Sequence, residues 1–254
     1  MGFERIVPGT VEWDAYFGNH IFRYQFALTR LQARGSKKIL DAACGVGYGT
    51  NFLATAGMQE LIGVDRDAPA LKLAADKFSH PALKFLQDDC HTLAAASLHG
   101  MYDAVVSFET LEHLPDPVAF LKQSYALLQT GGMLIISTPN ASVTSPAGKT
   151  DWEYHEKEYT ADELKTLLET AGYSNVELYG QSFSPVGKLR QELRGELNTI
   201  NSNPFNRAGR WIQQILKGHK PKAVLPEKAE DFEITLPAGF TQNPPFVLLA
   251  VAYK

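Results

Sequence analysis

Short hydrophobic runs alternate along the chain with longer segments in which hydrophobic residues recur at helical spacing. Short runs bounded by turn residues predict buried strands, and the longer pattern predicts amphipathic helices. The chain has seven such short runs, at residues 37–44, 60–66, 83–90, 102–109, 132–140, 175–180 and 246–254. Helix-like segments separate most of them, at residues 48–57, 68–78, 116–130 and 160–172. This alternation predicts parallel strands joined by crossover helices, and therefore an α/β fold.

Two segments fall outside this alternation, although we expect residues 1–254 to form a single domain. Residues 1–36 have a helical pattern and are expected to form an N-terminal cap. Residues 181–245 are an insertion before the last strand and a candidate substrate lid. Part of this insertion, 185–228, carries nine Lys or Arg residues against three acids. It is interpreted as a solvated face, as a site for an anionic acceptor, or as a membrane-surface contact through the amphipathic segment 210–218.

The composition and net charge of the chain restrict the classes of protein to which it can belong. The chain has 254 residues, 44% of them hydrophobic, and a formal net charge of −4 with a pI near 6.0. These values suit a soluble domain and do not favour nucleic-acid binding. No apolar run is long enough to span a bilayer, and no secretory leader is visible at the N-terminus. Only two cysteines occur, Cys44 and Cys90, so a reducing cytoplasm is the expected location.

A glycine-rich stretch, DAACGVGYGTN at residues 41–51, follows the first predicted strand. Ligands of open α/β sheets lie outside the carboxyl ends of the strands, and glycines there allow a ligand to approach the backbone. The glycines are spaced G-x-G-x-G, whereas a nicotinamide-binding loop has G-x-G-x-x-G. Asp41 stands just before the turn, where a carboxylate would repel a phosphate. The pattern therefore favours a cationic or amine-bearing ligand over a dinucleotide.

Four segments together resemble class I S-adenosylmethionine-dependent methyltransferases, in the branch that acts on small molecules and glycans. Residues 41–49 resemble motif I of the family, and GVDRD places Asp65 where the family's acid binds the ribose hydroxyls. LQDDC places Asp89 and the Cys90 amide at the position of the adenine contact, and SFETLEHLPDP at residues 107–117 resembles the segment after the fourth strand.

This resemblance implies a Rossmann-like, seven-stranded, mostly parallel sheet with an antiparallel last strand and helices on both faces. It also implies that S-adenosylmethionine is the cofactor and S-adenosylhomocysteine the product. The expected cofactor-binding residues are Asp41, Ala43, Gly45, Gly47, Asp65, Arg66, Asp89, Cys90, Phe108 and Glu109.

Methyl transfer from a sulfonium requires alignment of the acceptor and removal of its proton. A neutral hydroxyl is a poor nucleophile, so a general base is expected, and histidine suits this task near neutral pH. His155, in DWEYHEKEYTADEL, is the first candidate, because this segment resembles one found in sugar and glycan methyltransferases; His113, in ETLEHL, is the second. Glu109, Glu112 and His113 could bind a divalent ion, but the same segment occurs in metal-free relatives, so no metal is expected.

The acceptor is expected to be a small molecule or a sugar, with a nucleotide or lipid carrier left open. The residues expected to contact it share one face of the N-terminal helix and are Tyr16, His20, Arg23 and Tyr24. Methylation of a hydroxyl oxygen is the main hypothesis. The alternatives are an N- or C-methyltransferase and a nucleotide-binding module that kept the pocket without catalysis. The assembly is left open between a monomer and a homodimer.

Overall fold

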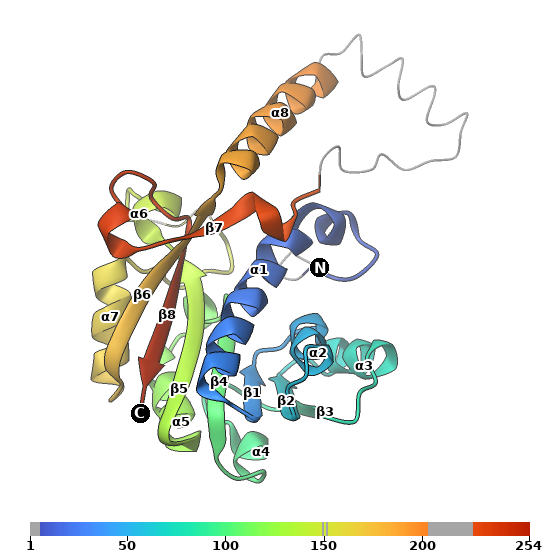
Figure 1. The fold of residues 1–254 in the computed structure, drawn as a ribbon, viewed down its shortest axis with the longest axis vertical. Helices are drawn as coiled ribbons and strands as arrows, with labels where there is room; N and C mark the ends of the chain where they lie inside the picture. The colour runs from blue at the N-terminus through green and yellow to red at the C-terminus, as the bar shows by residue number, and fades with distance from the viewer. Residues whose placement is uncertain (1–5, 149, 151, 203–225) are drawn as a thin grey trace. The chain divides into compact units, whose positions relative to one another are not determined.

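A computed structural model describes residues 6–148, 150, 152–202 and 226–254. Its central feature is an eight-stranded sheet in the order β3-β2-β1-β4-β5-β8-β6-β7 (Figure 1). The strands are β1 (Lys38–Ala42), β2 (Glu60–Asp65), β3 (Leu83–Gln87), β4 (Tyr102–Phe108), β5 (Leu128–Pro139), β6 (Ser174–Phe183), β7 (Phe232–Thr235) and β8 (Val247–Tyr253). The helices are α1 (Val11–Arg34), α2 (Tyr48–Thr55), α3 (Ala68–Lys77), α4 (Ala94–Ser97), η1 (Leu111–His113), α5 (Pro117–Leu127), α6 (Ala141–Thr144), α7 (Ala161–Thr170), α8 (Pro185–Ser202), η2 (Ala229–Asp231) and η3 (Pro237–Gly239).

The expected α/β class and mostly parallel sheet are confirmed. Strands β1 to β5 pair in parallel, and β8 pairs antiparallel with both β5 and β6. The sequence pattern predicted seven strands, and the structure adds an eighth, β7, within the segment assigned to the insertion. β7 has only four residues, which is too short to produce a clear alternation of polar and apolar positions.

Two helix starts follow the local sequence closely. Asp116 accepts a hydrogen bond from the amide of Ala119 at 2.9 Å, and Pro117 occupies the first turn of α5. Thr160 and Glu163 form a capping box at the start of α7. The end of α5 differs from the expected position. The helix stops at Leu127 and β5 begins at the next residue, four residues earlier than the hydrophobic run predicted.

One hydrophobic core covers a face of the sheet. Its strand residues include Leu40 and Val105, and its helix residues include Phe120 of α5 and Leu164 of α7. All four are fully buried. Because α4, α5 and α7 contribute to this core, the sheet cannot shift against them without exposing apolar area. The carboxyl ends of the parallel strands are therefore held in fixed positions at one edge of the sheet.

The described chain divides into two compact units. One consists of Met1–Phe22 and Phe183–Glu233, and the other of Arg23–Ser182 and Ile234–Lys254. No helix in the described part of the chain is long and apolar enough to cross a membrane.

Within the first unit, two of the basic residues of the insertion are neutralised locally. Arg190 of α8 pairs with buried Asp231 at 3.1 Å, and Arg194 pairs with Glu227 at 3.1 Å. Other basic residues of the insertion, and the amphipathic segment 210–218, lie outside the described residues; the basic ones are Arg207, Arg210, Lys217, Lys220 and Lys222.

Candidate active site

The glycine-rich turn joins β1 to α2 at the carboxyl edge of the sheet. Ala43, Gly45 and Gly47 all adopt left-handed backbone conformations, with φ values of 61°, 57° and 76°. A left-handed alanine is uncommon and costs about 1–2 kcal/mol. Strained residues of this kind concentrate at functional sites, so the turn is a candidate ligand-binding loop.

The glycines of this stretch, Gly45 and Gly47 in the turn and Gly49 in the first turn of α2, serve different purposes. A Cβ on Gly49 would lie 1.9 Å from the ring of Tyr24, and one on Gly47 would lie 2.5 Å from the ring of Phe85. These two glycines are therefore required for packing. A Cβ on Gly45 would meet no atom within 4 Å. Gly45 thus borders open space, which fits the expectation that a glycine here allows a ligand to approach the backbone.

Asp65 ends β2 and is held by two backbone amides. The amide of Gly45 donates to Oδ2 at 2.8 Å, and the amide of Asp67 donates to Oδ1 at 2.9 Å. The bond from Gly45 ties the glycine turn to the end of the neighbouring strand, and the bond from Asp67 orients the carboxylate locally. Each carboxylate oxygen can accept a second hydrogen bond, so the group can also bind a pair of ligand hydroxyls.

The third segment predicted to bind the cofactor follows β3. The backbone amide and the ring Nδ1 of His91 each lie 2.8 Å from Oδ1 of Asp89. These hydrogen bonds hold the pKa of Asp89 below its usual value, so this exposed carboxylate is ionised. Burial raises the pKa of Cys90 to about 12, so its side chain is a neutral thiol near pH 7. Arg66 is exposed.

Asp41 is fully buried beneath the glycine turn. Its carboxylate accepts from the Thr50 hydroxyl at 2.7 Å and from the Tyr24 hydroxyl at 3.2 and 3.3 Å. Burial raises the pKa of Asp41 to about 7, although these hydrogen bonds oppose the shift. The contacts link α1 and α2 to the end of β1. Any contribution of Asp41 to cofactor binding would act through this packing or through the backbone.

Arg23 and Glu109 form the next part of the site. Arg23 is buried, its Nε donates to Gln181 at 3.1 Å, and its Nη2 lies 3.6 Å from Glu109. Glu109 follows β4 in a left-handed conformation, with φ 51°, and Oε1 accepts from the Ser137 hydroxyl at 2.7 Å. The ring of Phe108 packs edge-on against Tyr24, with 4.9 Å between centroids. The site therefore has a second strained residue, at the end of β4.

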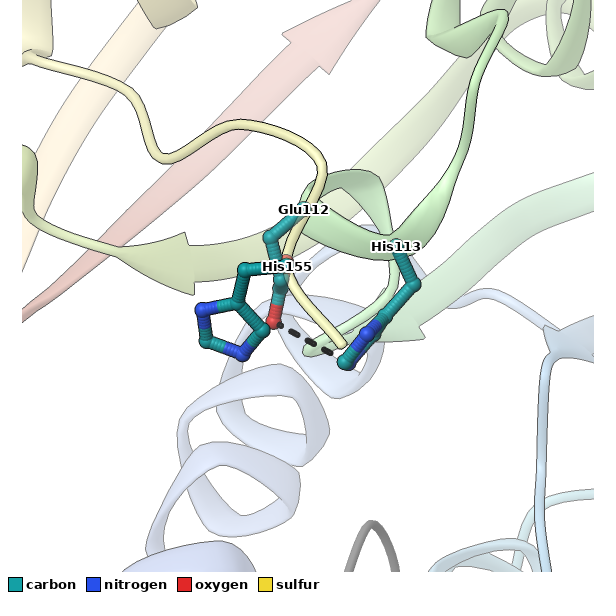
Figure 2. A group of neighbouring side chains, drawn as sticks. All are labelled: Glu112, His113 and His155. Atoms are coloured by element: carbon teal, nitrogen blue, oxygen red, sulfur yellow. Dashed lines mark ion pairs between the residues drawn. The ribbon is translucent and has the colours of Figure 1, made fainter. Parts of the chain in front are cut away.

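Glu112, His113 and His155 form a cluster beyond the end of β4 (Figure 2). One donor atom from each lies within 4.8 Å of the others, and the two imidazoles meet edge-to-face with 4.9 Å between centroids. The backbone brings them together, because the amides of Glu156 and Lys157 both donate to the carbonyl of Glu112, at 2.7 and 3.3 Å. His155 thereby reaches His113 from a loop 42 positions later in the chain.

The hydrogen bonds of the two imidazoles determine their tautomers. Nδ1 of His113 lies 2.8 Å from the carbonyl oxygen of Tyr154, and Nδ1 of His155 lies 2.8 Å from Oε1 of Glu158. A carbonyl oxygen can only accept, so Nδ1 of His113 carries a proton. Burial raises the pKa of Glu158, but hydrogen bonds from Thr144, Ser145 and His155 outweigh it and leave the pKa below its usual value. Glu158 is therefore an acceptor too, and in both neutral imidazoles Nε2 carries the lone pair.

Glu112 supplies a buried carboxyl group to the cluster. Its side chain is 1% exposed, and Oε2 accepts from the Thr138 hydroxyl at 2.8 Å. Oε1 lies 3.9 Å from Nε2 of His113 and has no hydrogen-bond partner among the described residues. Burial, reinforced by the negative charge of Glu109, raises the pKa of Glu112 well above its usual value. Sequence reasoning had grouped Glu112 with His113 but not with His155.

Two residues predicted to contact the acceptor lie in the other compact unit. Tyr16 is 46% exposed and His20 is half-buried, and both belong to Met1–Phe22. Their role in acceptor binding stays a prediction. Sequence reasoning also missed the aromatic residues around the cluster. Trp152 is 58% exposed and stacks on His155 with 5.9 Å between centroids, and Tyr154 is 42% exposed. The sequence around Trp152 and Tyr154 contains no motif that identifies them, because a role for them depends on their proximity to His155 and His113 in the folded chain.

Comparisons with known proteins point to the same family as the sequence motifs. Residues 20–178 match the family model described as "Methyltransferase domain". The chain is 29% identical over 258 residues to a "Probable S-adenosylmethionine-dependent methyltransferase" of Mycolicibacterium smegmatis, and the match covers 99% of this chain and 93% of the relative. It is 34% identical over 167 residues to a ubiquinone biosynthesis O-methyltransferase of Cereibacter sphaeroides, which covers 59% of this chain and 65% of the relative.

A solved structure supports the same fold. The plantazolicin methyltransferase BpumL, solved with S-adenosylhomocysteine, has a TM-score of 0.60 at 15% identity and covers 96% of this chain and 87% of its own. The left-handed turn, the open space at Gly45 and the acid at the end of β2 fit S-adenosylmethionine as the cofactor. The chain belongs to the methyltransferase domain family and is a class I S-adenosylmethionine-dependent methyltransferase.

Proposed function

We propose that this methyltransferase acts on a hydroxyl oxygen of a small molecule or sugar. The observation that carries this proposal is the pair of imidazoles at His113 and His155, each with Nδ1–H engaged and Nε2 as the acceptor nitrogen. A hydroxyl must lose its proton to become a good nucleophile, and a neutral imidazole nitrogen is suited to accept it. A neutral amine acceptor needs no such group.

His155 is the preferred proton acceptor of the two. Its Nδ1 faces the Glu158 carboxylate, whereas Nδ1 of His113 faces a neutral carbonyl. A carboxylate stabilises the imidazolium that forms when Nε2 takes up a proton, and it also fixes the ring orientation. His155 is also the more buried of the two side chains, with 12% exposed against 21% for His113. His113 then contributes to positioning the acceptor.

The cofactor side of the site is proposed to involve the turn and the ends of β2 and β3. S-adenosylmethionine supplies an activated methyl group on its sulfonium. The open backbone at Gly45 would admit the amino-acid tail, and Asp65 would accept from the ribose hydroxyls. Asp89 and the Cys90 amide would bind the adenine edge. Ala43, Arg66, Phe108 and Glu109 are proposed to line the same pocket.

An acceptor with a flat apolar face fits the surroundings of the cluster. Trp152 and Tyr154 expose aromatic surface beside His155 and His113. Sugar rings and aromatic rings both pack well against such side chains, because they bury apolar area without losing their polar edges. The ubiquinone biosynthesis O-methyltransferase relative methylates oxygen, as its name says, which supports the same choice of acceptor atom.

The test is a panel of acceptors assayed with S-adenosylmethionine and resolved by mass spectrometry and NMR. Catechols, sugar nucleotides and free sugars represent the hydroxyl class, and matched amines represent the alternative. Formation of O-methyl ethers supports the proposal. Transfer confined to nitrogen or carbon would contradict it and favour the N- or C-methyltransferase alternative. A lipid-linked acceptor, a cytoplasmic location and a homodimer stay predictions.

A further inference from the structure

We propose that Glu112, His113 and His155 together bind a divalent transition-metal ion. The three side chains converge on one point from two segments of the chain, as Figure 2 shows. Two imidazoles and one carboxylate form a common ligand set for such ions. The inference deepens the proposed function and rests on it only for the position of the acceptor.

The distances are compatible with an ion after a small adjustment. Donor atoms bound about 2.0–2.2 Å from an ion lie roughly 3–4 Å apart. Glu112 Oε1 and His113 Nε2 are already 3.9 Å apart, and all three donors lie within 4.8 Å of one another. The widest pair therefore has to approach by about 1 Å. Because Glu112 Oε1 and His113 Nε2 already meet this range, the widest pair is one that includes His155.

The outer partners of both imidazoles are those of metal-bound histidines. Metal-binding histidines donate their second ring N–H to a carboxylate or a backbone carbonyl, which fixes the tautomer and orients the lone pair. His155 faces the Glu158 carboxylate and His113 faces the Tyr154 carbonyl, both at 2.8 Å. Glu158 is itself held by the hydroxyls of Thr144 and Thr150. The outer contacts thus set Nε2 as the ligand atom in both rings.

The buried carboxyl group of Glu112 is an independent indication. Oε2 has a hydrogen bond from Thr138, whereas Oε1 is buried, lies on the histidine side and has no hydrogen-bond partner among the described residues. A buried polar atom without a partner is destabilising and calls for an explanation. A cation at this point provides one. The guanidinium of Arg23 is a cation in the same region, but it forms its ion pair with Glu109.

The ligand chemistry favours ions such as Mn²⁺, Co²⁺, Fe²⁺ or Zn²⁺ over Mg²⁺ or Ca²⁺. Imidazole nitrogen binds the transition metals well, whereas Mg²⁺ and Ca²⁺ prefer oxygen. With three protein ligands, the ion keeps a position for an acceptor hydroxyl. A metal-bound hydroxyl has a lowered pKa. The ion would therefore promote deprotonation of the acceptor hydroxyl. The imidazoles would perform this task when no ion is bound.

The test measures metal binding by the full-length protein without cofactor or acceptor. The protein is treated with chelator, dialysed, and titrated with Mn²⁺ by electron paramagnetic resonance and with Co²⁺ by visible absorption. We expect one ion per chain, and binding of Mg²⁺ at least about 100-fold weaker, because of the imidazole ligands. Saturable binding that is unaffected by the cluster variants, or no binding of either probe, would overturn the proposal. So would equal affinity for Mg²⁺.

Variants separate a ligand site from adventitious binding. His155→Ala and Glu112→Gln should weaken Mn²⁺ binding by more than about 100-fold, and Glu158→Gln by about 10–100-fold, the usual effect of an outer partner. His80→Ala, a histidine outside the cluster, should leave it unchanged. Calorimetry with S-adenosylmethionine verifies that each variant is folded; if Glu112→Gln fails this check, His155→Ala and Glu158→Gln decide. Metal binding without methyl transfer to any hydroxyl would refute the proposed function alone, and metal-independent transfer without binding would refute this inference alone.

Discussion

Tyr24 donates its hydroxyl to the carboxylate of Asp41, at 3.2 Å from Oδ2 and 3.3 Å from Oδ1, and both side chains are buried. The same tyrosine ring fills the space that a side chain on Gly49 would occupy. A single residue of α1 therefore holds the carboxylate of Asp41 at the end of β1 and leaves no room for a side chain at position 49 in α2. This pair therefore stabilises the segment between β1 and α2 that contains the proposed cofactor-binding turn.

Replacement of Tyr24 by Phe should lower the free energy of unfolding by about 1–3 kcal/mol, because a buried acceptor loses its donor. Urea unfolding measures the change. Tyr154→Phe is the matched control, since Tyr154 is exposed and should give a change near zero. Equal effects of the two substitutions would show that the Tyr24 hydroxyl contributes nothing to stability.

Asp41 should make stability depend on pH. Its folded pKa is about 7, whereas an unfolded aspartate has a pKa near 3.9. Between these values the unfolded chain releases the proton and the folded protein keeps it, so the free energy of unfolding falls as pH rises, by at most about 1.4 kcal/mol per pH unit. Above about pH 7 this contribution is lost, and Asp41 no longer makes the free energy of unfolding depend on pH.

The control for this effect is Asp41→Asn, which cannot ionise. Unfolding of both proteins by urea at about pH 5 and about pH 8, without cofactor, gives the difference in stability between them. We expect this difference to move in favour of Asn as pH rises. A difference that does not change with pH would mean that Asp41 is ionised throughout the range.

The glycines at positions 45 and 47 should respond differently to alanine. Both have a left-handed backbone, so each substitution costs about 1–2 kcal/mol of strain. Gly47→Ala should cost about 1–3 kcal/mol more, because its Cβ would overlap the Phe85 ring. Gly45→Ala should instead mainly weaken S-adenosylmethionine binding. Unfolding and calorimetry separate the two, and a stability loss for Gly45→Ala as large as for Gly47→Ala would refute the distinction.

Asp65→Ala should weaken S-adenosylmethionine binding by about 1.5–3 kcal/mol for each charge-assisted hydrogen bond that is lost. Isothermal titration calorimetry measures this change. Asp76→Ala, which removes an exposed carboxylate from α3, provides the control and should bind the cofactor like the wild type. An affinity that stays at the wild-type level in Asp65→Ala would remove Asp65 from the cofactor site.

Much of the fold could be predicted from the sequence, because its signals are local. Buried strands, the capping box at Thr160 and the position of Asp65 at the end of β2 all follow from short patterns. β7 could not be predicted, since four residues carry too little periodicity.

The cluster of Glu112, His113 and His155 could not be predicted from the sequence for a different reason. His113 and His155 were each identifiable as candidates, but their proximity depends on hydrogen bonds from the amides of Glu156 and Lys157 to the Glu112 carbonyl. Backbone contacts between distant segments leave no side-chain pattern. The expectation that no metal binds was based on residues 109–113 alone, and the proximity of His155 is what leads us to propose a metal site.

The central claim, that the histidine cluster activates an acceptor hydroxyl, is tested most directly by turnover of His155→Ala, His113→Ala and the double variant with the best hydroxyl acceptor. Cofactor affinity is measured in parallel by calorimetry. We expect each variant to bind S-adenosylmethionine nearly as the wild type does. His155→Ala should lose about 10²–10⁴-fold in turnover, the usual contribution of a group that removes a proton. A double variant that binds the cofactor and keeps near-normal turnover would contradict the claim and leave positioning as the basis of catalysis.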